Sequence, residues 1–262
     1  MILLLCNQKG GVGKSTTTYH LTRSAIREGQ RVLVIDLDPQ GNITRGLTRD
    51  VASDAPVVAD ALSERSTLTL EDILVPGIWP GLTVAPTVGE TLTPVRDELA
   101  STTKPGREAR LRGQLEAVKA DYDLVLIDSG PALDTLTLNA LTAADGVILI
   151  TQSSSWSLDG LALLLRTIRD VRQFYNPSLE VAGLILNQHE PRTASGKYWA
   201  GELATAAGEN GLRLIEPYVP KRNAIKDAID YGQGLDEGDY KARPLGKLYD
   251  EILKQLMERN AR

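Results

Sequence analysis

Short apolar runs alternate with amphipathic stretches along the whole chain. The runs are rich in Val, Ile and Leu, which is typical of strands buried on both faces of a sheet. The intervening segments repeat apolar residues at three-to-four spacing, which is typical of helices with one buried face. This alternation predicts an α/β fold with a mostly parallel, twisted sheet and helices on both faces. The predicted strands are residues 2–6, 31–36, 82–86, 122–128, 146–152, 181–187 and 213–219, and the predicted helices are 14–28, 107–120, 136–144, 158–175, 196–210 and 244–259.

Composition narrows the class of protein. With 42% hydrophobic and 24% charged residues, the chain has none of the polar bias of a disordered protein. Its apolar runs are far shorter than the roughly 20 residues of a membrane-spanning helix, and its first residues lack a basic leader. We therefore expect a cytoplasmic protein. One cysteine, Cys6, and two histidines exclude a thiolate or imidazole metal centre, so a catalytic metal should have oxygen ligands.

A glycine-rich turn follows the first predicted strand and leads into the first predicted helix. Its sequence, NQKGGVGKST over residues 7–16, combines inward-turned backbone amides with a helix N-terminus, and both favour phosphate. In such a loop the lysine reaches the β- and γ-phosphates and the following hydroxyl binds Mg²⁺. The predicted nucleotide-binding residues are therefore Lys9, Gly10, Gly11, Val12, Gly13, Lys14, Ser15 and Thr16.

Three carboxylates follow buried strands. Asp36 and Asp38 end the second predicted strand, and Asp128 ends the run Leu-Val-Leu-Ile that precedes it. Ligands of α/β sheets bind at the carboxyl ends of parallel strands, so these side chains are expected beside the glycine-rich turn. An apolar strand that ends in aspartate is the Walker B arrangement, which holds Mg²⁺ through water. Ser15 and Asp128 are the predicted metal ligands. Of Asp36 and Asp38, one is expected near the hydrated Mg²⁺ and the other near the attacking water.

The chain resembles the deviant Walker A ATPases, and among them the ParA-type partition proteins. Residues 9–15 match the family signature KGGxGK[ST], residues 36–42 match its DxDPQGN segment, and the resemblance extends over nearly all 262 residues. It implies a single P-loop NTPase domain that hydrolyses ATP with Mg²⁺. It also implies three catalytic groups: Lys14, Asp38 as the residue that positions the attacking water, and Lys9 as a lysine that crosses a dimer interface to the ATP of the partner subunit. By the same resemblance, Asp36 joins Ser15 and Asp128 in the metal site. One departure is Gly130, where the family usually has proline.

The same resemblance implies contacts with adenine and with DNA. Asn187, at the end of a predicted strand, stands where the family reads the base, although capping of the strand end is the alternative. Pro220 and Lys221 begin a stretch similar to the family segment that lies against the nucleotide. The C-terminal region of ParA-type dimers binds DNA without sequence preference, but residues 192–262 hold 12 basic and 11 acidic residues and Ala224 replaces a common basic residue. The candidate DNA-binding residues are Arg192, Lys197, Lys221, Arg222 and Lys226.

The whole pattern predicts a small partition ATPase. The chain begins on its first strand, so we expect one deviant Walker A domain over residues 1–262 without an N-terminal helix-turn-helix domain. The expected partners are a second copy when ATP is bound, nucleoid DNA, and a ParB-like centromere-binding protein, with no membrane. The net charge of −5 limits DNA binding to a local patch.

Several alternatives stay open. The last predicted helix has one apolar face and could lie on a membrane surface, as in the related MinD proteins, or pack on the sheet. A ParA-like ATPase could also position a protein cargo, and a biosynthetic ligase similar to dethiobiotin synthetase would use a small-molecule acceptor. A nitrogenase-reductase-like electron carrier is excluded, because it needs cysteines that bridge two subunits and this chain has only Cys6.

Overall fold

The computed structural model describes residues 1–49, 51–152 and 156–258. Its centre is one eight-stranded sheet in the order β3-β4-β2-β5-β1-β6-β7-β8. All neighbouring strands are parallel except β3 and β4, which pair antiparallel. The predicted mostly parallel sheet is therefore confirmed. The strands are β1 (Ile2–Cys6), β2 (Val32–Leu37), β3 (Val75–Pro76), β4 (Leu82–Ala85), β5 (Leu124–Ser129), β6 (Gly146–Gln152), β7 (Glu180–Asn187) and β8 (Leu214–Ile215).

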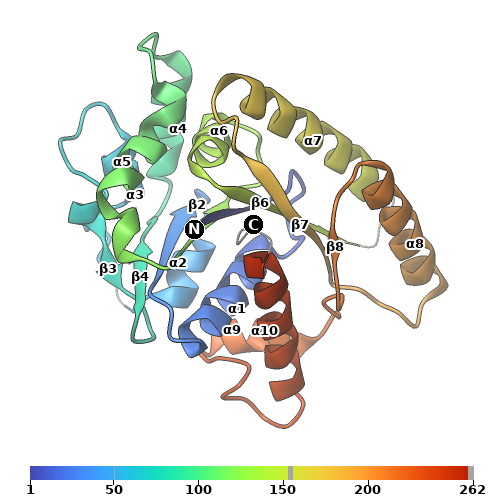
Figure 1. Ribbon diagram of the computed structural model, residues 1–262. Coiled ribbons are helices and arrows are strands. Elements are labelled where there is room, and N and C mark those ends of the chain that lie inside the picture. Colours follow the sequence, from blue (N-terminus) through green and yellow to red (C-terminus); the bar gives the residue numbers. More distant parts are fainter. Residues whose placement is uncertain (50, 153–155, 259–262) are drawn as a thin grey trace.

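Helices cover both faces of this sheet (Figure 1). One face carries α3 (Val58–Leu62), α4 (Leu92–Ser101), α5 (Arg110–Val118), α6 (Thr135–Ala143), α7 (Trp156–Phe174) and α8 (Ala194–Glu209), whose apolar residues join one buried cluster. The other face carries α1 (Lys14–Arg27), α2 (Asn42–Leu47), α9 (Asn223–Asp230) and α10 (Arg243–Glu258), which join the second cluster. Three short 3₁₀ turns, η1 (Glu71–Ile73), η2 (Arg107–Ala109) and η3 (Lys119–Asp121), complete the described elements.

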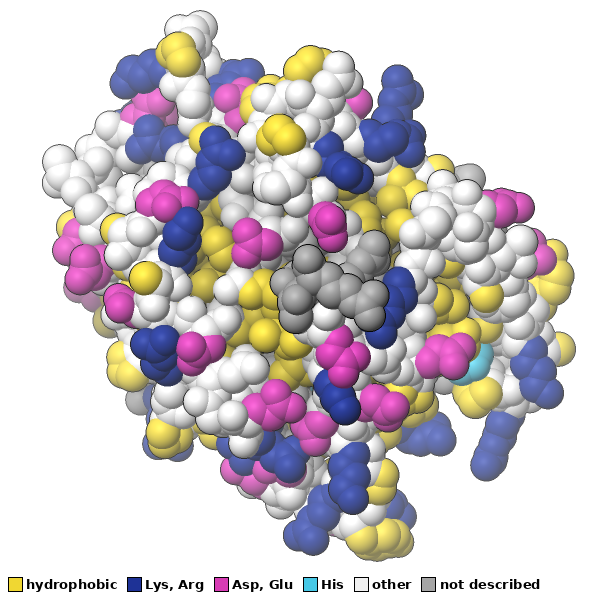
Figure 2. Space-filling view, viewed as in Figure 1, with side chains coloured by type: hydrophobic (Ala, Val, Ile, Leu, Met, Phe, Trp, Pro, Cys, Tyr) yellow, Lys and Arg dark blue, Asp and Glu magenta, His cyan; other side chains and the backbone are white. Residues whose placement is uncertain are grey.

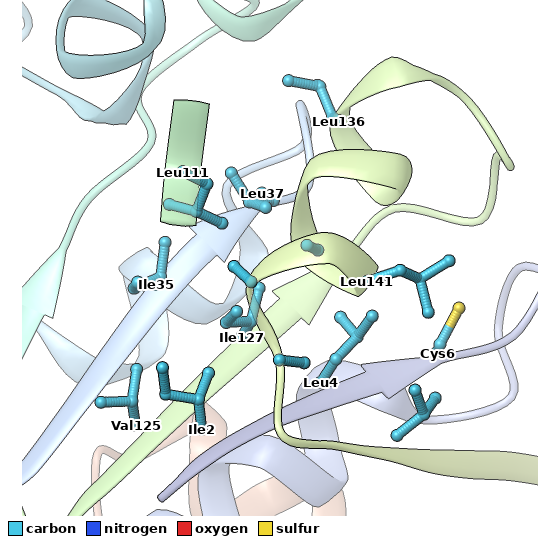
Figure 3. Close-up of a cluster of buried hydrophobic side chains, with 14 of the residues drawn as sticks. Ile2, Leu4, Cys6, Ile35, Leu37, Leu111, Val125, Ile127, Leu136 and Leu141 are labelled. Atoms are coloured by element: carbon cyan, nitrogen blue, oxygen red, sulfur yellow. The ribbon is translucent and has the colours of Figure 1, made fainter. Parts of the chain in front are cut away.

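Alternation along each strand divides the core into these two layers. In β1, Leu4 and Cys6 point to the first cluster, whereas Leu3 and Leu5 point to the second. Figure 3 shows Leu4 beside Ile127 of β5, with Cys6 further along β1, under helices of the first layer. Because side chains alternate with a period of two, a strand buried on both faces must be apolar at nearly every position. This packing explains the near-continuous apolar runs of the sequence, and it places the carboxyl ends of β1, β2 and β5 at one edge.

The buried His20 ties α1 to the second layer. Its Nε2 lies 2.9 Å from the carbonyl oxygen of Ile225, at the start of α9, and its ring lies 4.7 Å from the ring of Tyr249 of α10. Burial lowers the pKa of His20 to about 4, although the hydrogen bond to Ile225 acts in the opposite direction. The folded protein therefore holds this ring neutral.

The pH dependence of the unfolding free energy should reflect the protonation of the His20 ring. An unfolded histidine has a pKa of about 6.5, so between about pH 6.5 and pH 4 the unfolded chain binds the extra proton and stability falls as the pH falls. We expect the wild type to lose about 2 kcal/mol more unfolding free energy than His20→Gln between pH 7 and pH 5. Urea denaturation of both proteins at each pH measures the difference, and equal losses would show that His20 is not held neutral.

The C-terminal helix packs on the sheet. Tyr249, Ile252, Leu253 and Leu256 of α10 are buried in the second cluster, and α10 lies beside α1. This arrangement favours packing over the membrane-surface alternative for this apolar face. None of the helices in the described part of the chain is long and apolar enough to cross a bilayer. The expected helix end at Arg259 falls outside the described residues.

Candidate nucleotide site

The glycine-rich turn forms a tight phosphate loop between β1 and α1. Gly11 and Gly13 have φ angles of 76° and 92°, a region in which side chains other than glycine are strained. A Cβ atom on Gly13 would also collide with the side-chain amide of Asn187. Because α1 starts at Lys14, directly after the loop, its first backbone N–H groups lack partners within the helix, and such groups favour an anion. The residues present therefore fit an anion.

Three amide side chains brace the loop from the neighbouring strands. Asn187 donates from Nδ2 to the carbonyl oxygen of Val12 at 2.8 Å. Gln152 and Gln188 donate from Nε2 to the carbonyl oxygen of Gly11, at 2.9 Å and 3.1 Å. The Oδ1 atom of Asn187 accepts from the backbone N–H of Gln188, at 2.8 Å. The amide of Asn187 is buried and has both ends occupied, which favours the strand-end cap over the adenine contact.

Base selectivity separates these two roles of Asn187. If it braces the loop, Asn187→Ala should weaken ATP and GTP binding by the same factor, about tenfold for one buried hydrogen bond. Isothermal titration with both nucleotides measures the two factors. Loss of ATP affinity with unchanged GTP affinity would instead assign the side chain to the base.

Lys14, Ser15 and Asp128 meet at the start of α1. Lys14 is 6% exposed although it is a lysine. The Ser15 hydroxyl donates to Asp128 Oδ2 at 2.6 Å, and Thr18 donates to Asp128 Oδ1 at 3.1 Å. Burial raises the pKa of Asp128 to about 6, while the hydrogen bond from Ser15 and the charge of Lys14 act in the opposite direction. The predicted contact between the phosphate loop and the Walker B strand is therefore present.

The neighbouring Asp36 is fully buried beside Asp128, with which it is in register across β2 and β5. Burial and the charge of Asp128 raise the pKa of Asp36 to about 8. Its Oδ2 accepts from the N–H and the hydroxyl of Thr44, at 3.0 Å and 2.6 Å, and its Oδ1 accepts from the N–H of Asp38 at 3.1 Å. Asp36 thus fixes the start of α2, and no hydrogen bond joins it to Ser15 in the described chain.

The donor set beside the phosphate loop fits Mg²⁺. This ion prefers oxygen ligands, keeps several waters, and takes the rest from one or two carboxylates and the phosphates of a nucleotide. The Ser15 hydroxyl and the Asp128 carboxylate supply such oxygens, and a divalent cation would relieve the repulsion between Asp128 and Asp36. The described residues contain no cluster of three or more His, Cys, Asp or Glu side chains that could hold a metal by themselves.

A cavity of 680 Å³ opens over the phosphate loop. Asp38 lines it, is 8% exposed, and accepts from the backbone N–H of Gln40 at 3.0 Å. Residues 128–131, at the end of β5, are termed the switch segment, and Pro131 lines the same cavity. The neighbouring Gly130 has no positive φ, and a Cβ there would meet Asp38 Oδ1 at 3.7 Å, an ordinary contact. A side chain would therefore fit at this departure from the family pattern.

Lys9 differs from Lys14 in its surroundings. Its side chain is exposed, and it is not among the described residues that line the cavity of its own subunit. The backbone N–H of Lys9 donates to Asn7 Oδ1 at 2.8 Å, so the loop is fixed while the ammonium group is in solvent. The predicted contact with a second subunit requires this exposure.

The other predicted residues fall in two places. Pro220 forms an isolated parallel β-bridge with His189. The Nζ atom of Lys221 lies 3.6 Å from Oε2 of Glu190. Lys221 also lines a smaller hollow of 320 Å³, and Gln188 lines both this hollow and the main cavity. Lys226 lines the main cavity itself. Arg192, Lys197 and Arg222 are exposed and outside both hollows.

Several site residues escape the sequence analysis. Gln152 and Gln188, which brace the loop, and Thr44, which holds Asp36, carry no motif. Gln40 and Asn42 line the cavity, and their place in the DxDPQGN segment is the signal by which they could have been found. Arg45 also lines it, and nothing in the sequence marks this residue.

Known proteins are similar over the full chain. A family model described as an AAA domain matches residues 1–181. The chromosome partitioning protein ParA of Caulobacter vibrioides is 35% identical over 266 residues, covering 100% of this chain and 97% of that protein. The sporulation initiation inhibitor protein Soj of Bacillus subtilis is 34% identical over 255 residues, covering 97% of each.

Two solved structures are also similar. Cobyrinic acid a,c-diamide synthase from Mycobacterium smegmatis, with bound ADP and magnesium, superposes with a TM-score of 0.82 at 30% identity and covers 100% of this chain and 96% of that one. The McdA–ATP complex of Cyanothece has a TM-score of 0.86 at 22% identity, over 98% and 96% of the chains, and this shows the fold alone. ATP and Mg²⁺ are the cofactors that the phosphate loop and its carboxylates fit. By its sequence, its sheet and this site, the chain belongs to the ParA/Soj family of P-loop ATPases.

Proposed function

We propose that this ATPase pairs two subunits over bound ATP, binds DNA without sequence preference in that state, and positions plasmid or chromosomal DNA through a ParB-like centromere-binding partner. The observation that carries the proposal is the contrast between two lysines of one loop. Lys14 is buried in the cavity of its own subunit, whereas Lys9 is exposed outside it. A second subunit placed face to face would give Lys9 a triphosphate to contact.

The cavity supports hydrolysis by direct attack of water. The water oxygen bonds to the γ-phosphorus as the bond to the β,γ-bridging oxygen breaks, and ADP and phosphate leave. Asp38, which lines the cavity, would orient that water. Lys14, with Lys9 from the second subunit, would neutralise charge that develops on the transferred phosphoryl group. Mg²⁺, held by the Ser15 hydroxyl and the Asp128 carboxylate, would supply further neutralisation of phosphate charge.

The DNA-binding surface is proposed to include Arg192, Lys197 and Arg222, all exposed. Lys221 contributes less, because its ammonium lies 3.6 Å from Glu190. Basic and acidic side chains are interspersed over the face shown in Figure 2. With a net charge of −5, one subunit is expected to offer only a few phosphate contacts. Pairing of two subunits would double these contacts, which makes DNA affinity dependent on nucleotide and steeply dependent on salt. Such binding would place the protein on the nucleoid in the cytoplasm.

DNA binding tests the proposal directly. We expect fluorescence anisotropy to show binding of a random-sequence duplex with a non-hydrolysable ATP analogue, little binding with ADP, and a decrease of at least about tenfold in affinity between 50 and 200 mM salt. Arg192→Ala and Arg222→Ala should weaken the binding, and Arg65→Ala, an exposed arginine that faces Glu98, serves as the matched control. Equal binding with ADP and ATP analogue would reject the proposal.

Three alternatives give different results in related assays. A MinD-like membrane protein would sediment with anionic liposomes in an ATP-dependent manner. A biosynthetic enzyme would need an acceptor, so slow ATP turnover without any small molecule, accelerated by DNA and an adaptor, would argue against it. An ATPase that positions a protein cargo would bind DNA as proposed, and its adaptor would carry no centromere-binding activity.

A further inference from the structure

Two cations outside the phosphate loop face the same cavity. Arg45 of α2 and Lys226 of α9 both line it, together with Gly11, Lys14 and Ser15 of the loop and the start of α1. Neither residue is part of the glycine-rich turn or of the predicted metal site. Their helices follow β2 and β8, which lie apart in the sheet, so the fold brings them together from distant parts of the chain.

The helices α2 and α9 pack closely against each other, which fixes the positions of Arg45 and Lys226. A Cβ atom on Gly46 would lie 3.0 Å from Cγ2 of Ile229 and 3.5 Å from the ring of Tyr19. Glycine at this position therefore lets α2 approach both α9 and α1. The hydrogen bond between His20 and the carbonyl oxygen of Ile225 holds α9 against α1. The backbones that carry Arg45 and Lys226 are thus packed against the helix that begins at the phosphate loop.

Neither cation has an acidic partner. In the described part of the chain no carboxylate lies within ion-pair distance of Arg45 or Lys226, and Arg45 donates only to the neutral Asn42 Oδ1, at 2.6 Å. Asp230 is one helical turn from Lys226 and lines the cavity, yet the two form no ion pair. The charged groups of the lining are three cations and two carboxylates: Lys14, Arg45, Lys226, Asp38 and Asp230.

This distribution of charge suits a polyphosphate. Guanidinium and ammonium groups bind phosphate oxygens strongly where no carboxylate competes for them. We propose that Arg45 and Lys226 form a second cationic wall of the nucleotide site and bind phosphate oxygens of the ATP held by the phosphate loop. Lys226 then acts at the nucleotide and not at the DNA surface to which the sequence assigned it. The inference rests on the ATPase activity and is independent of DNA binding and of dimer formation.

Nucleotide affinity of single variants tests this wall. We expect Arg45→Ala and Lys226→Ala each to weaken binding of a Mg²⁺-loaded, non-hydrolysable ATP analogue by about five- to tenfold at low salt, a moderate effect because both side chains are exposed. The control is Arg169→Ala, which removes an exposed arginine of α7. This helix covers the other face of the sheet, so the variant should change the affinity less than twofold. Lys226→Arg should retain most of the affinity, since it keeps the charge.

A second measurement, thermal unfolding, distinguishes weaker nucleotide binding from a loss of stability in the variants. The melting temperature without nucleotide should be the same in the wild type and in both alanine variants, whereas the increase caused by the ATP analogue should shrink in the variants. Affinities of Arg45→Ala and Lys226→Ala equal to that of Arg169→Ala would overturn the proposal. So would a Lys226→Ala protein with unchanged nucleotide affinity and weakened DNA binding, because that result places Lys226 on the DNA surface.

Discussion

Lys14→Ala is expected to lose ATP binding by a factor of at least about 100. Lys14 is 6% exposed at the start of α1, where its ammonium group can donate to phosphate oxygens in a site that excludes most water. Charge-assisted hydrogen bonds of this kind contribute about 1.5–3 kcal/mol each, and the variant loses more than one. Isothermal titration with ATP and Mg²⁺ measures the loss.

The control for this variant is Lys247→Ala, which removes an exposed lysine of α10. It should bind ATP as the wild type does. Circular dichroism should show that Lys14→Ala is folded, because its short side chain leaves the packing of the sheet intact. A folded Lys14→Ala protein with wild-type affinity would contradict the assignment of the cavity as the nucleotide site.

Asp38→Ala should bind ATP but hydrolyse it at least about 100 times more slowly. Asp38 lines the cavity next to the switch segment and is fixed by the N–H of Gln40, at 3.0 Å from its Oδ1. Positioning of a reacting water by a carboxylate typically contributes about 10² to 10⁴ in rate. Single-turnover measurements of phosphate release give the hydrolysis step without product release.

Asp38→Asn sharpens this test. The asparagine keeps an oxygen that can accept from Gln40 but lacks the negative charge, so the loop should stay in place while hydrolysis falls as in the alanine variant. Asp239→Ala, an exposed acid outside the described cavity lining, should hydrolyse normally. Wild-type turnover in Asp38→Asn would reject the proposed role of Asp38.

The fold is predictable from the sequence where a single pattern is long and consistent. Strands β1 and β6 occupy residues 2–6 and 146–152 as expected, because strands buried on both faces are apolar throughout. Helix α1 ends at Arg27, one residue before the predicted end, and is followed by Gly29 at φ 78°, because glycine readily adopts the left-handed conformation that ends a helix. The local sequence is sufficient to predict the secondary structure of these segments.

The missed elements are short and depend on tertiary packing. The sequence analysis did not predict α2, α3, α4 or α9, or the strand β3. The helix α2 has six residues and includes Gly46, so its propensity is low. It forms because Asp36 holds its first turn through Thr44 and because α9 packs on Gly46. Contacts of this kind cannot be predicted from a short stretch of sequence.

One predicted strand was too long. Residues 213–219 are apolar enough for a strand, but β8 contains only Leu214–Ile215. Pro217 has no N–H to donate to the neighbouring strand, so pairing stops before it. This proline is the signal in the sequence that ends β8.

The candidate site was predictable as far as its motifs reach. The loop, Ser15 and Asp128 are together as the motifs require. The motifs say nothing about Arg45, and they placed Lys226 by its neighbours in sequence, whereas its place in the cavity depends on how α9 lies on α1 and α2. Asn187 was found, but its orientation toward Val12 follows from the close approach of β7 to the loop.

The size of the protein in solution with and without nucleotide tests the central claim most directly. Light scattering of Asp38→Ala should give the mass of one chain, 28.4 kDa, with ADP and twice that mass with saturating ATP and Mg²⁺. Lys9→Ala in the same background should bind ATP and remain a single chain. A single-chain mass for Asp38→Ala at full ATP occupancy would contradict the account, because Lys9 would then have no triphosphate to meet.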